Sequence, residues 1–185
     1  DEYKSPADSR ADFLRTLSRE RFKPNEAMQR GIDFENEIKT IADKFIELKI
    51  EDYEAKSNLF KIADIVKGGL WQQTCKKDLT IGNQEFLLYG KCDVVKRDTI
   101  YDIKFTSNYE LGKFLDSAQH LIYLYCLDLP KFQYLVSDGE EYWVEDYYNH
   151  AGIEDEIKSK INDFLSYLEN DKEAKEMFFT KWGSK

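Results

Sequence analysis

The chain has 185 residues, which suits one domain, and its hydrophobic fraction of 42% is enough for a buried core and excludes wholesale disorder. No apolar run approaches the roughly 20 residues of a membrane span, and the polar first residues do not resemble a signal peptide, so we expect a cytoplasmic protein without a membrane partner. The net charge of −9 argues against a polyanionic partner for the surface as a whole, but local fields govern phosphate binding, and arginines concentrate before residue 31.

The first third of the chain is predicted to be helical. A short helix is expected at about 7–17, and a longer one begins at Asn25, because apolar residues recur at offsets of three and four. This stripe consists of Phe34, Ile38, Ile41, Phe45 and Leu48. The next segment, "LFKIADIVKGGL", fits either a short helix or a strand.

The middle of the chain is predicted to be a meander of three strands. Residues 71–81, 82–95 and 99–106 are rich in β-branched and aromatic residues, and turn signals separate them. Helical spacing then returns from Tyr109 to Tyr125 and ends before Pro130.

The last part of the chain reads as a hairpin followed by a helix. Residues 131–148 form the hairpin, with its turn at Asp138–Gly139, and the final helix covers about 153–170. The order of elements predicts an α/β or α+β fold, with a central mixed β-sheet flanked by helices. We expect a single domain over 1–185, with its core at about 25–150.

The second and third strands place two acids and a lysine close together. If Arg97–Asp98 is a two-residue turn, Val94 faces Tyr101 and Asp93 faces Asp102. Directly opposed residues have Cβ atoms about 5 Å apart, so two carboxylates there repel unless one is protonated or a cation lies between them. Lys104 projects from the same face as Asp102. A three-residue loop would shift this pairing, and an exposed hairpin face with scattered charges is the alternative.

Two helices carry further polar candidates. Glu35 lies beside the apolar stripe of its helix, and Asp33 and Glu37 compete with it as a third acid. Gln119 and Tyr123 are four residues apart and share a helix face, where an amide and a phenol could bind phosphate oxygens together. The alternative for this pair is an ordinary amphipathic helix in which Tyr123 packs against the core.

These segments share their residue types, order and spacing with the motifs of one nuclease family. They are Glu35 with Gly31, Asp93 in "GKCDVV", Asp102 and Lys104 in "YDIKFT", and Gln119 and Tyr123 in "QHLIY". The set resembles the PD-(D/E)xK nuclease superfamily, and more narrowly its RecB-like and phage-type exonuclease branch. In that branch, G-x-x-x-E on a helix is followed by G-x-x-D, D-x-K and Q-x-x-x-Y.

The resemblance implies a restriction-endonuclease-like core and a metal-dependent enzyme that hydrolyses phosphodiester bonds in DNA, as exonucleases of recombination and repair do. Mg²⁺ or Mn²⁺ would be held by Glu35, Asp93, Asp102 and the carbonyl of Ile103. Lys104 would assist the attacking water, and Gln119 with Tyr123 would support the site. The alternative is a catalytically weak or inactive nuclease-fold module that acts with a partner protein.

Other parts of the sequence suggest partners and exclude one cofactor. Four basic residues near the N-terminus are expected to guide phosphates, namely Arg15, Arg19, Arg21 and Lys23. The acidic C-terminal half could bind a protein partner. The cysteines at 75, 92 and 126 form no C-x-x-C pair, so we expect reduced core thiols and no zinc site or iron–sulfur cluster.

Overall fold

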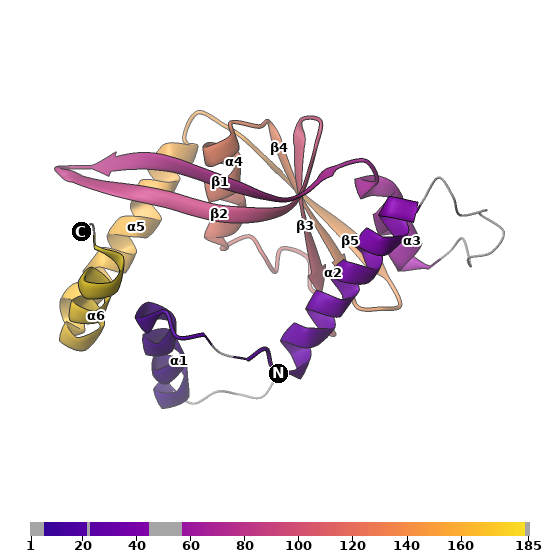
Figure 1. Ribbon diagram of the computed structural model, residues 1–185. Helices are drawn as coiled ribbons and strands as arrows, with labels where there is room; N and C mark the ends of the chain where they lie inside the picture. The colour runs from indigo at the N-terminus through magenta and orange to yellow at the C-terminus, as the bar shows by residue number, and fades with distance from the viewer. Residues whose placement is uncertain (1–5, 22, 45–56, 184–185) are drawn as a thin grey trace. The chain divides into compact units, whose positions relative to one another are not determined.

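The computed structural model describes residues 6–21, 23–44 and 57–183 (Figure 1). The helices are α1 (Pro6–Ser18), α2 (Glu26–Lys44), α3 (Asn58–Val66), α4 (Ala118–Leu127), α5 (Ile153–Asn170) and α6 (Lys172–Trp182). The strands are β1 (Leu70–Ile81), β2 (Gln84–Lys96), β3 (Thr99–Phe105), β4 (Lys131–Ser137) and β5 (Tyr142–Tyr148). No helix within the described ranges has both the length and the apolar character that a membrane crossing requires.

The five strands form one mixed sheet in the order β1-β2-β3-β4-β5. Every neighbouring pair is antiparallel except β3 and β4, which run parallel. A parallel pair needs a crossover connection, and α4 provides it between these two strands. The expected α+β architecture, with a central mixed sheet flanked by helices, is confirmed.

Helices α2 and α3 cover one face of the sheet (Figure 1). The apolar stripe of α2 contributes Phe34 and Ile38, which pack with Val94 and Ile103 of the sheet and with the buried side of α3. Most of the segment "LFKIADIVKGGL", which fitted either a helix or a strand, belongs to helix α3. Ser57 caps this helix by accepting a hydrogen bond from the Phe60 amide. Phe45 and Leu48 lie outside the described residues.

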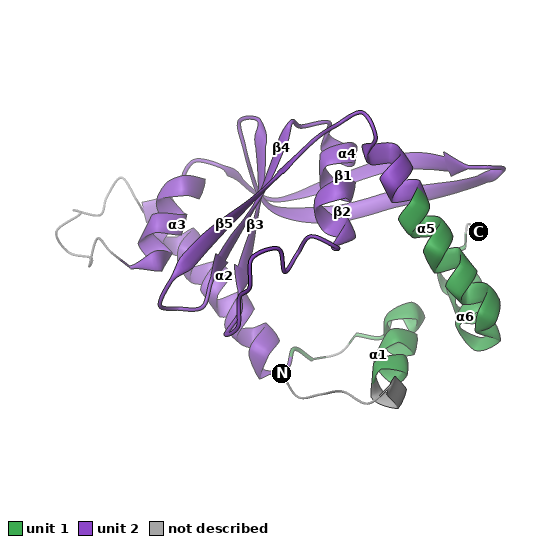
Figure 2. Cartoon of the chain, turned by 180° about the vertical axis from the view of Figure 1, so that it is seen from behind, with its two compact units in different colours: residues 1–24, 159–185 green, residues 25–158 purple. Residues whose placement is uncertain are grey.

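Helix α4 lies on the opposite face of the sheet, as the two views in Figures 1 and 2 show. Its contact with β2 is close, because Gly90 faces the ring of Tyr123 and leaves no room for a side chain there. The three cysteines are free thiols, and burial raises the pKa of each of them. Cys75 and Cys92 are buried and Cys126 is half-buried, and the reduced state of these thiols stays a prediction.

The predicted helix start at Tyr109 is wrong. Helix α4 begins only at Ala118, where Ser117 accepts a hydrogen bond from the Gln119 amide. Gly112 adopts the left-handed conformation at φ 83°, which interrupts a helix, and Glu145 anchors the segment by accepting hydrogen bonds from the Tyr109 hydroxyl and the Gly112 amide. The apolar residues before Ala118 therefore lie in a loop despite their helical spacing, and Leu111 among them is 87% exposed.

The chain divides into two compact units, residues 25–158 and residues 1–24 with 159–185 (Figure 2). The smaller unit has its own apolar cluster around Leu17, Leu168 and Ala174. Arg10 forms ion pairs there with Asp171 and Glu173. Helix α6 in this unit was not anticipated from the sequence, whereas α5 covers the expected range.

Candidate functional site

The candidate site lies where β2 and β3 separate. Their ladder pairs Val94 with Tyr101, Val95 with Ile100 and Lys96 with Thr99, which confirms the predicted register around the Arg97–Asp98 turn. The next pair does not form. Instead, Oδ2 of Asp93 accepts a hydrogen bond of 2.8 Å from the backbone N–H of Ile103. The expectation that Asp93 directly faces Asp102 in the ladder is therefore wrong, because the Asp93 side chain occupies the space between the diverging strands.

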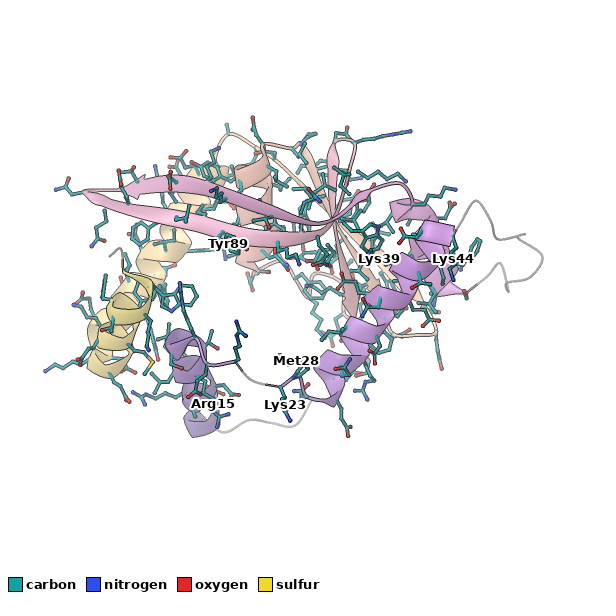
Figure 3. All side chains as sticks on the ribbon, viewed as in Figure 1. Arg15, Lys23, Met28, Lys39, Lys44 and Tyr89 are labelled. Carbon is teal, nitrogen blue, oxygen red and sulfur yellow. The ribbon has the colours of Figure 1, made fainter. Side chains whose placement is uncertain are left out.

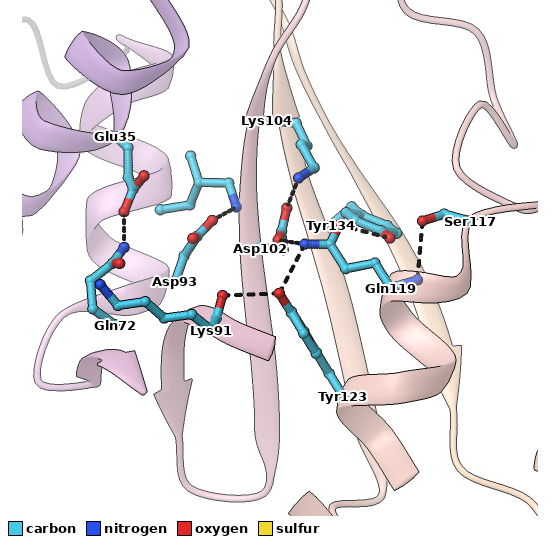
Figure 4. Close-up of polar contacts among 11 residues, drawn as sticks. Glu35, Gln72, Lys91, Asp93, Asp102, Lys104, Ser117, Gln119, Tyr123 and Tyr134 are labelled. Atoms are coloured by element: carbon cyan, nitrogen blue, oxygen red, sulfur yellow. Dashed lines mark hydrogen bonds and ion pairs between the residues drawn. The ribbon is translucent and has the colours of Figure 1, made fainter. Parts of the chain in front are cut away.

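Asp102 is the most buried acid of the site, with only 1% of its surface exposed. Its Oδ2 lies 2.6 Å from Nζ of Lys104 but accepts no well-oriented hydrogen bond, and its Oδ1 accepts one of 2.6 Å from the amide nitrogen of Gln119. The Asp102 carboxylate thus has the Lys104 ammonium on one oxygen and the Gln119 amide on the other (Figure 4). The Lys104 side chain is 31% exposed, so this is a pair between a buried carboxylate and a partly solvated ammonium.

Helix α4 brings Gln119 and Tyr123 to the same site. The amide nitrogen of Gln119 is 3.3 Å from the Tyr123 hydroxyl, which in turn donates a hydrogen bond of 3.0 Å to the backbone carbonyl of Lys91. The sequence spacing of four residues therefore does place both side chains on one face, as expected. Tyr134 of β4 adds its hydroxyl, 3.4 Å from Oε1 of Gln119.

Glu35 is the acid that α2 turns toward the sheet. It is half-buried, whereas Asp33 and Glu37 are exposed on the same helix. The Glu35 carboxylate accepts a hydrogen bond from the side-chain amide of Gln72 on β1. The structure thereby selects Glu35 from the three competing acids of α2.

Two contributors, Gln72 and Tyr134, were missed in the sequence. Gln72 has a left-handed backbone at φ 55°, which is unusual for a residue within a strand. It holds Glu35 in place from β1. No motif marks either residue, because each reaches the site through the pairing of strands that are distant in sequence.

Burial raises the pKa of all three carboxylates, and repulsion from neighbouring acids adds to the shift for Asp93 and Glu35. Burial raises the pKa of Asp93 to about 7, and the negative charges of Asp102 and Glu35 add to this shift. Burial also raises the pKa of Asp102, against the lowering effect of the Lys104 ammonium. The pKa of Glu35 is raised by burial as well. Such raised pKa values are expected where acids are gathered without a cation to neutralise them.

The donor chemistry of the site fits a hard divalent cation. Three carboxylates are available, and the buried Oδ2 of Asp102 lacks a hydrogen bond that would satisfy it. Across the described ranges, however, no three acid, histidine or cysteine side chains stand close enough together to enclose a metal ion. Gln72, the Ile103 amide and Lys104 each engage one of the acids, so a cation would have to compete with these partners.

The predicted phosphate guides belong to the smaller unit and have partners there. The Arg19 guanidinium stacks 3.9 Å over the Trp182 ring, and Arg15 forms an ion pair with Asp12. Arg21 and Lys23 are exposed. Their role stays a prediction.

Gly90→Ala should destabilise the protein and disturb the support of the site. A Cβ at this position would lie 2.1 Å from a ring carbon of Tyr123, and overpacking of this kind costs about 1–3 kcal/mol. Urea unfolding measures the loss. Gly31→Ala is the control, because a Cβ there meets no atom within 4 Å and alanine favours a helix interior by about 0.5–1 kcal/mol. Equal stability of both variants would contradict the tight packing between β2 and α4.

Asp93→Asn should stabilise the metal-free protein at pH 8. The pKa of Asp93 is raised on folding from 3.8 to about 7, so its protonated form is favoured in the folded state. The contribution of Asp93 to stability is therefore fully present below about pH 4 and is lost as the pH rises to about 7. Asparagine removes this loss and can still accept the Ile103 N–H, with a gain on the order of 2 kcal/mol at pH 8. Urea unfolding in chelator at pH 5 and pH 8 tests this, and an unchanged pH dependence in the variant would refute it.

Comparison with known proteins finds similarity at the level of structure alone. No protein-family model matches the sequence, and no curated protein sequence matches it either. Among solved structures, "Crystal structure of SSO0001" is similar with a TM-score of 0.50, 13% identity and coverage of 86% of both chains. "Crystal Structure of LHK-Exo in complex with dAMP" is similar with a TM-score of 0.50, 15% identity and coverage of 92% of this chain and 83% of that one.

A second structure of the latter protein, "an alkaline exonuclease (LHK-Exo) from Laribacter hongkongensis", has 16% identity and a TM-score of 0.48. The chain thus shares its α+β fold with structures that include an exonuclease.

Proposed function

We propose that this protein is a metal-dependent deoxyribonuclease, and more specifically an exonuclease of the RecB-like and phage-type branch. The observation that carries the proposal is that the buried Asp102 contacts both Lys104 and Gln119. The negative charges of Asp102 and Glu35 also act on Asp93. These residues belong to the set on which the motif resemblance rests, and they come from α2, β2, β3 and α4. One structural neighbour, LHK-Exo, was solved in complex with dAMP, which supports a nucleotide substrate.

The acids would hold Mg²⁺ or Mn²⁺, with the carbonyl of Ile103 as a further oxygen ligand. When bound, the cation supplies Lewis acidity and makes a hydroxide nucleophile accessible near neutral pH. A bound cation would offset the negative charges of Asp102 and Glu35, which add to the effect of burial in raising the pKa of Asp93.

Lys104 would stabilise the negative charge that develops on the phosphoryl group. Its side chain is 31% exposed, so the ammonium can reach a substrate while it remains paired with the buried Asp102. A fixed cation aimed at the developing charge is worth more in a partly dehydrated site than in water. Gln119 and Tyr123 would orient Asp102 and, through it, Lys104.

The decisive experiment is incubation with linear duplex, circular duplex and single-stranded DNA, with and without Mn²⁺. We expect metal-dependent products from linear DNA and none from the closed circle. Cleavage of the circle would replace the exonuclease assignment with an endonuclease, and no cleavage of any substrate would refute the enzymatic proposal.

A second candidate is a catalytically weak nuclease-fold module that acts with a partner protein. The specific observation in its favour is that the acids of the described residues do not form a ready metal cluster, since other side chains hold them. Titration calorimetry with Mn²⁺ separates the two candidates, because only the enzyme needs to bind the metal. The acidic C-terminal half remains a candidate surface for a protein partner.

Replacing Arg15, Arg21 and Lys23 with glutamine should weaken DNA binding. Each lost phosphate contact lowers the slope of log K against log salt by about 0.9 for duplex DNA. Fluorescence anisotropy at several salt concentrations measures the slope. Lys172→Gln in the same unit serves as the control. If the slopes of the triple variant and wild type are equal, the basic residues near the N-terminus are only a solvated surface.

A further inference from the structure

One face of the ribbon formed by β1 and β2 is exposed within the described part of the larger unit. Alternate residues of both strands are exposed there, and the register pairs Lys76 with Tyr89 and Thr74 with Lys91. The other face of the ribbon packs on α4 through Cys75, Leu79 and Leu88, among others. We call the group of Thr74, Lys76, Tyr89 and Lys91 the ribbon patch.

Tyr89 is the aromatic centre of the ribbon patch. It is 64% exposed and is labelled on β2 in Figure 3. Directly paired side chains have Cβ atoms about 5 Å apart, and alternate residues of a strand lie about 6.7 Å apart. Lys76 and Lys91 therefore flank the ring of Tyr89 across the strand pair and along the strand.

Both lysines of the ribbon patch have free ammonium groups within the described part of the chain. The other two lysines of this ribbon are engaged: Lys77 donates to the Tyr125 carbonyl, and Lys96 donates to the Ile65 carbonyl. Lys76 and Lys91 make no such contact with any described residue. Two cations without a hydrogen bond or ion pair to any described residue thus lie on either side of an exposed ring.

The ribbon patch is continuous with the candidate site. Lys91 is two residues from Asp93, its carbonyl accepts the hydrogen bond from Tyr123, and its charge acts on Glu35. Figure 4 draws Lys91 among the site residues. Farther along the ribbon the exposed positions include Asp78 and Glu85, so the positive surface is confined to the half nearest the site.

We propose that the ribbon patch binds a single strand of the nucleic acid substrate, with one base stacked on Tyr89 and phosphates paired with Lys76 and Lys91. Stacking on an exposed aromatic ring beside cationic side chains is the usual means of holding single strands without sequence preference. The acidic end of the ribbon repels phosphates and directs the strand toward the site. This inference rests on the proposed function, because it names the form of the substrate at the same site.

The test is binding of a fluorescein-labelled 12-nucleotide oligothymidylate to the full chain in chelator, followed by anisotropy. Tyr89→Ala should weaken binding about tenfold or more, and Tyr89→Phe should bind within twofold of wild type because the ring remains. Tyr148→Ala is the matched control. Tyr148 is 60% exposed on another strand and also neighbours a lysine, Lys131, but that lysine is already paired with Asp146.

The two lysines are tested by salt dependence. The Lys76→Gln, Lys91→Gln double variant should reduce the slope of log K against log salt by about 1.4, which is 0.7 for each phosphate of a single strand. Lys131→Gln should leave the slope unchanged. Thermal melting verifies that each variant is folded.

The inference is overturned if Tyr89→Ala binds the oligothymidylate as tightly as Tyr148→Ala does, or if the double lysine variant keeps the wild-type slope. It is also overturned if the wild type does not bind the strand. Hydrolysis of bis(p-nitrophenyl) phosphate by the wild type with Mn²⁺ reports on the proposed chemistry separately. If Tyr89→Ala weakens binding but the wild type hydrolyses no diester, the inference about the ribbon patch stands and the enzymatic proposal is refuted.

Discussion

Lys104→Met should lower the rate of DNA cleavage by roughly 10² to 10³ while the protein remains folded and binds DNA. The methionine keeps the apolar part of the side chain and removes the ammonium, which lies 2.6 Å from the buried Asp102. Loss of a charge that acts mainly in the transition state lowers kcat with little change in affinity. Single-turnover cleavage of linear DNA in Mn²⁺ measures the effect.

Lys131→Met is the matched control for this experiment. Lys131 lies on the neighbouring strand, its side chain is 28% exposed compared with 31% for Lys104, and it also pairs with an aspartate at 3.0 Å. Its partner Asp146 is far more exposed than Asp102. We expect the control to cleave at close to the wild-type rate. Equal rates for the two variants would remove Lys104 from the mechanism, even if the enzyme were active.

Asp102→Asn should abolish both cleavage and stabilisation by metal. In the wild type, divalent metal at a hundredfold excess over Kd stabilises the folded state by about 2.7 kcal/mol, which corresponds to an increase in Tm of roughly 5–10 °C for a chain of this size. Asparagine keeps the shape of the side chain and can still accept the hydrogen bond from Gln119, but it lacks the charge that a hard cation needs. Thermal melting with and without millimolar Mn²⁺ provides the first measurement.

Asp146→Asn tests whether the response is specific to the site. This aspartate also pairs with a lysine and accepts a hydrogen bond from a glutamine, Gln133, but it lies away from the other acids. It should retain the full metal response and the full cleavage rate. The metal assignment fails if the wild type shows no shift in Tm with Mg²⁺ or Mn²⁺, or if Asp102→Asn shifts as much as the wild type does.

These two experiments separate the two candidate functions. An inactive module predicts that Lys104→Met and Lys131→Met differ in nothing but stability. If the protein is an enzyme, Lys104→Met should lose activity and Lys131→Met should retain it. The comparison is informative because the two lysine–aspartate pairs share their residue types and lie in the same sheet, but differ in the burial of the acid.

The sequence by itself determined the elements that depend on local pattern. Runs rich in β-branched and aromatic residues, together with turn signals, located all five strands, and the turn at Arg97–Asp98 set the register that the three pairs of β2 and β3 follow. The spacing of Gln119 and Tyr123 placed both on one helix face, where they share a hydrogen bond. Each of these features depends on residues a few positions apart, so the periodicity of the backbone suffices to predict them.

Only the tertiary structure decided which acid of α2 joins the site and how the acids are held. Glu35 was distinguished from Asp33 and Glu37 by the packing of α2 on the sheet and by Gln72, which lies 37 positions away. The separation of β2 from β3 at Asp93, and the start of α4 at Ala118 instead of Tyr109, depend in the same way on partners distant in the chain, such as Ile103 and Glu145. Local periodicity carries no information about such contacts, because they arise from burial and hydrogen bonding between segments that meet only in the folded chain.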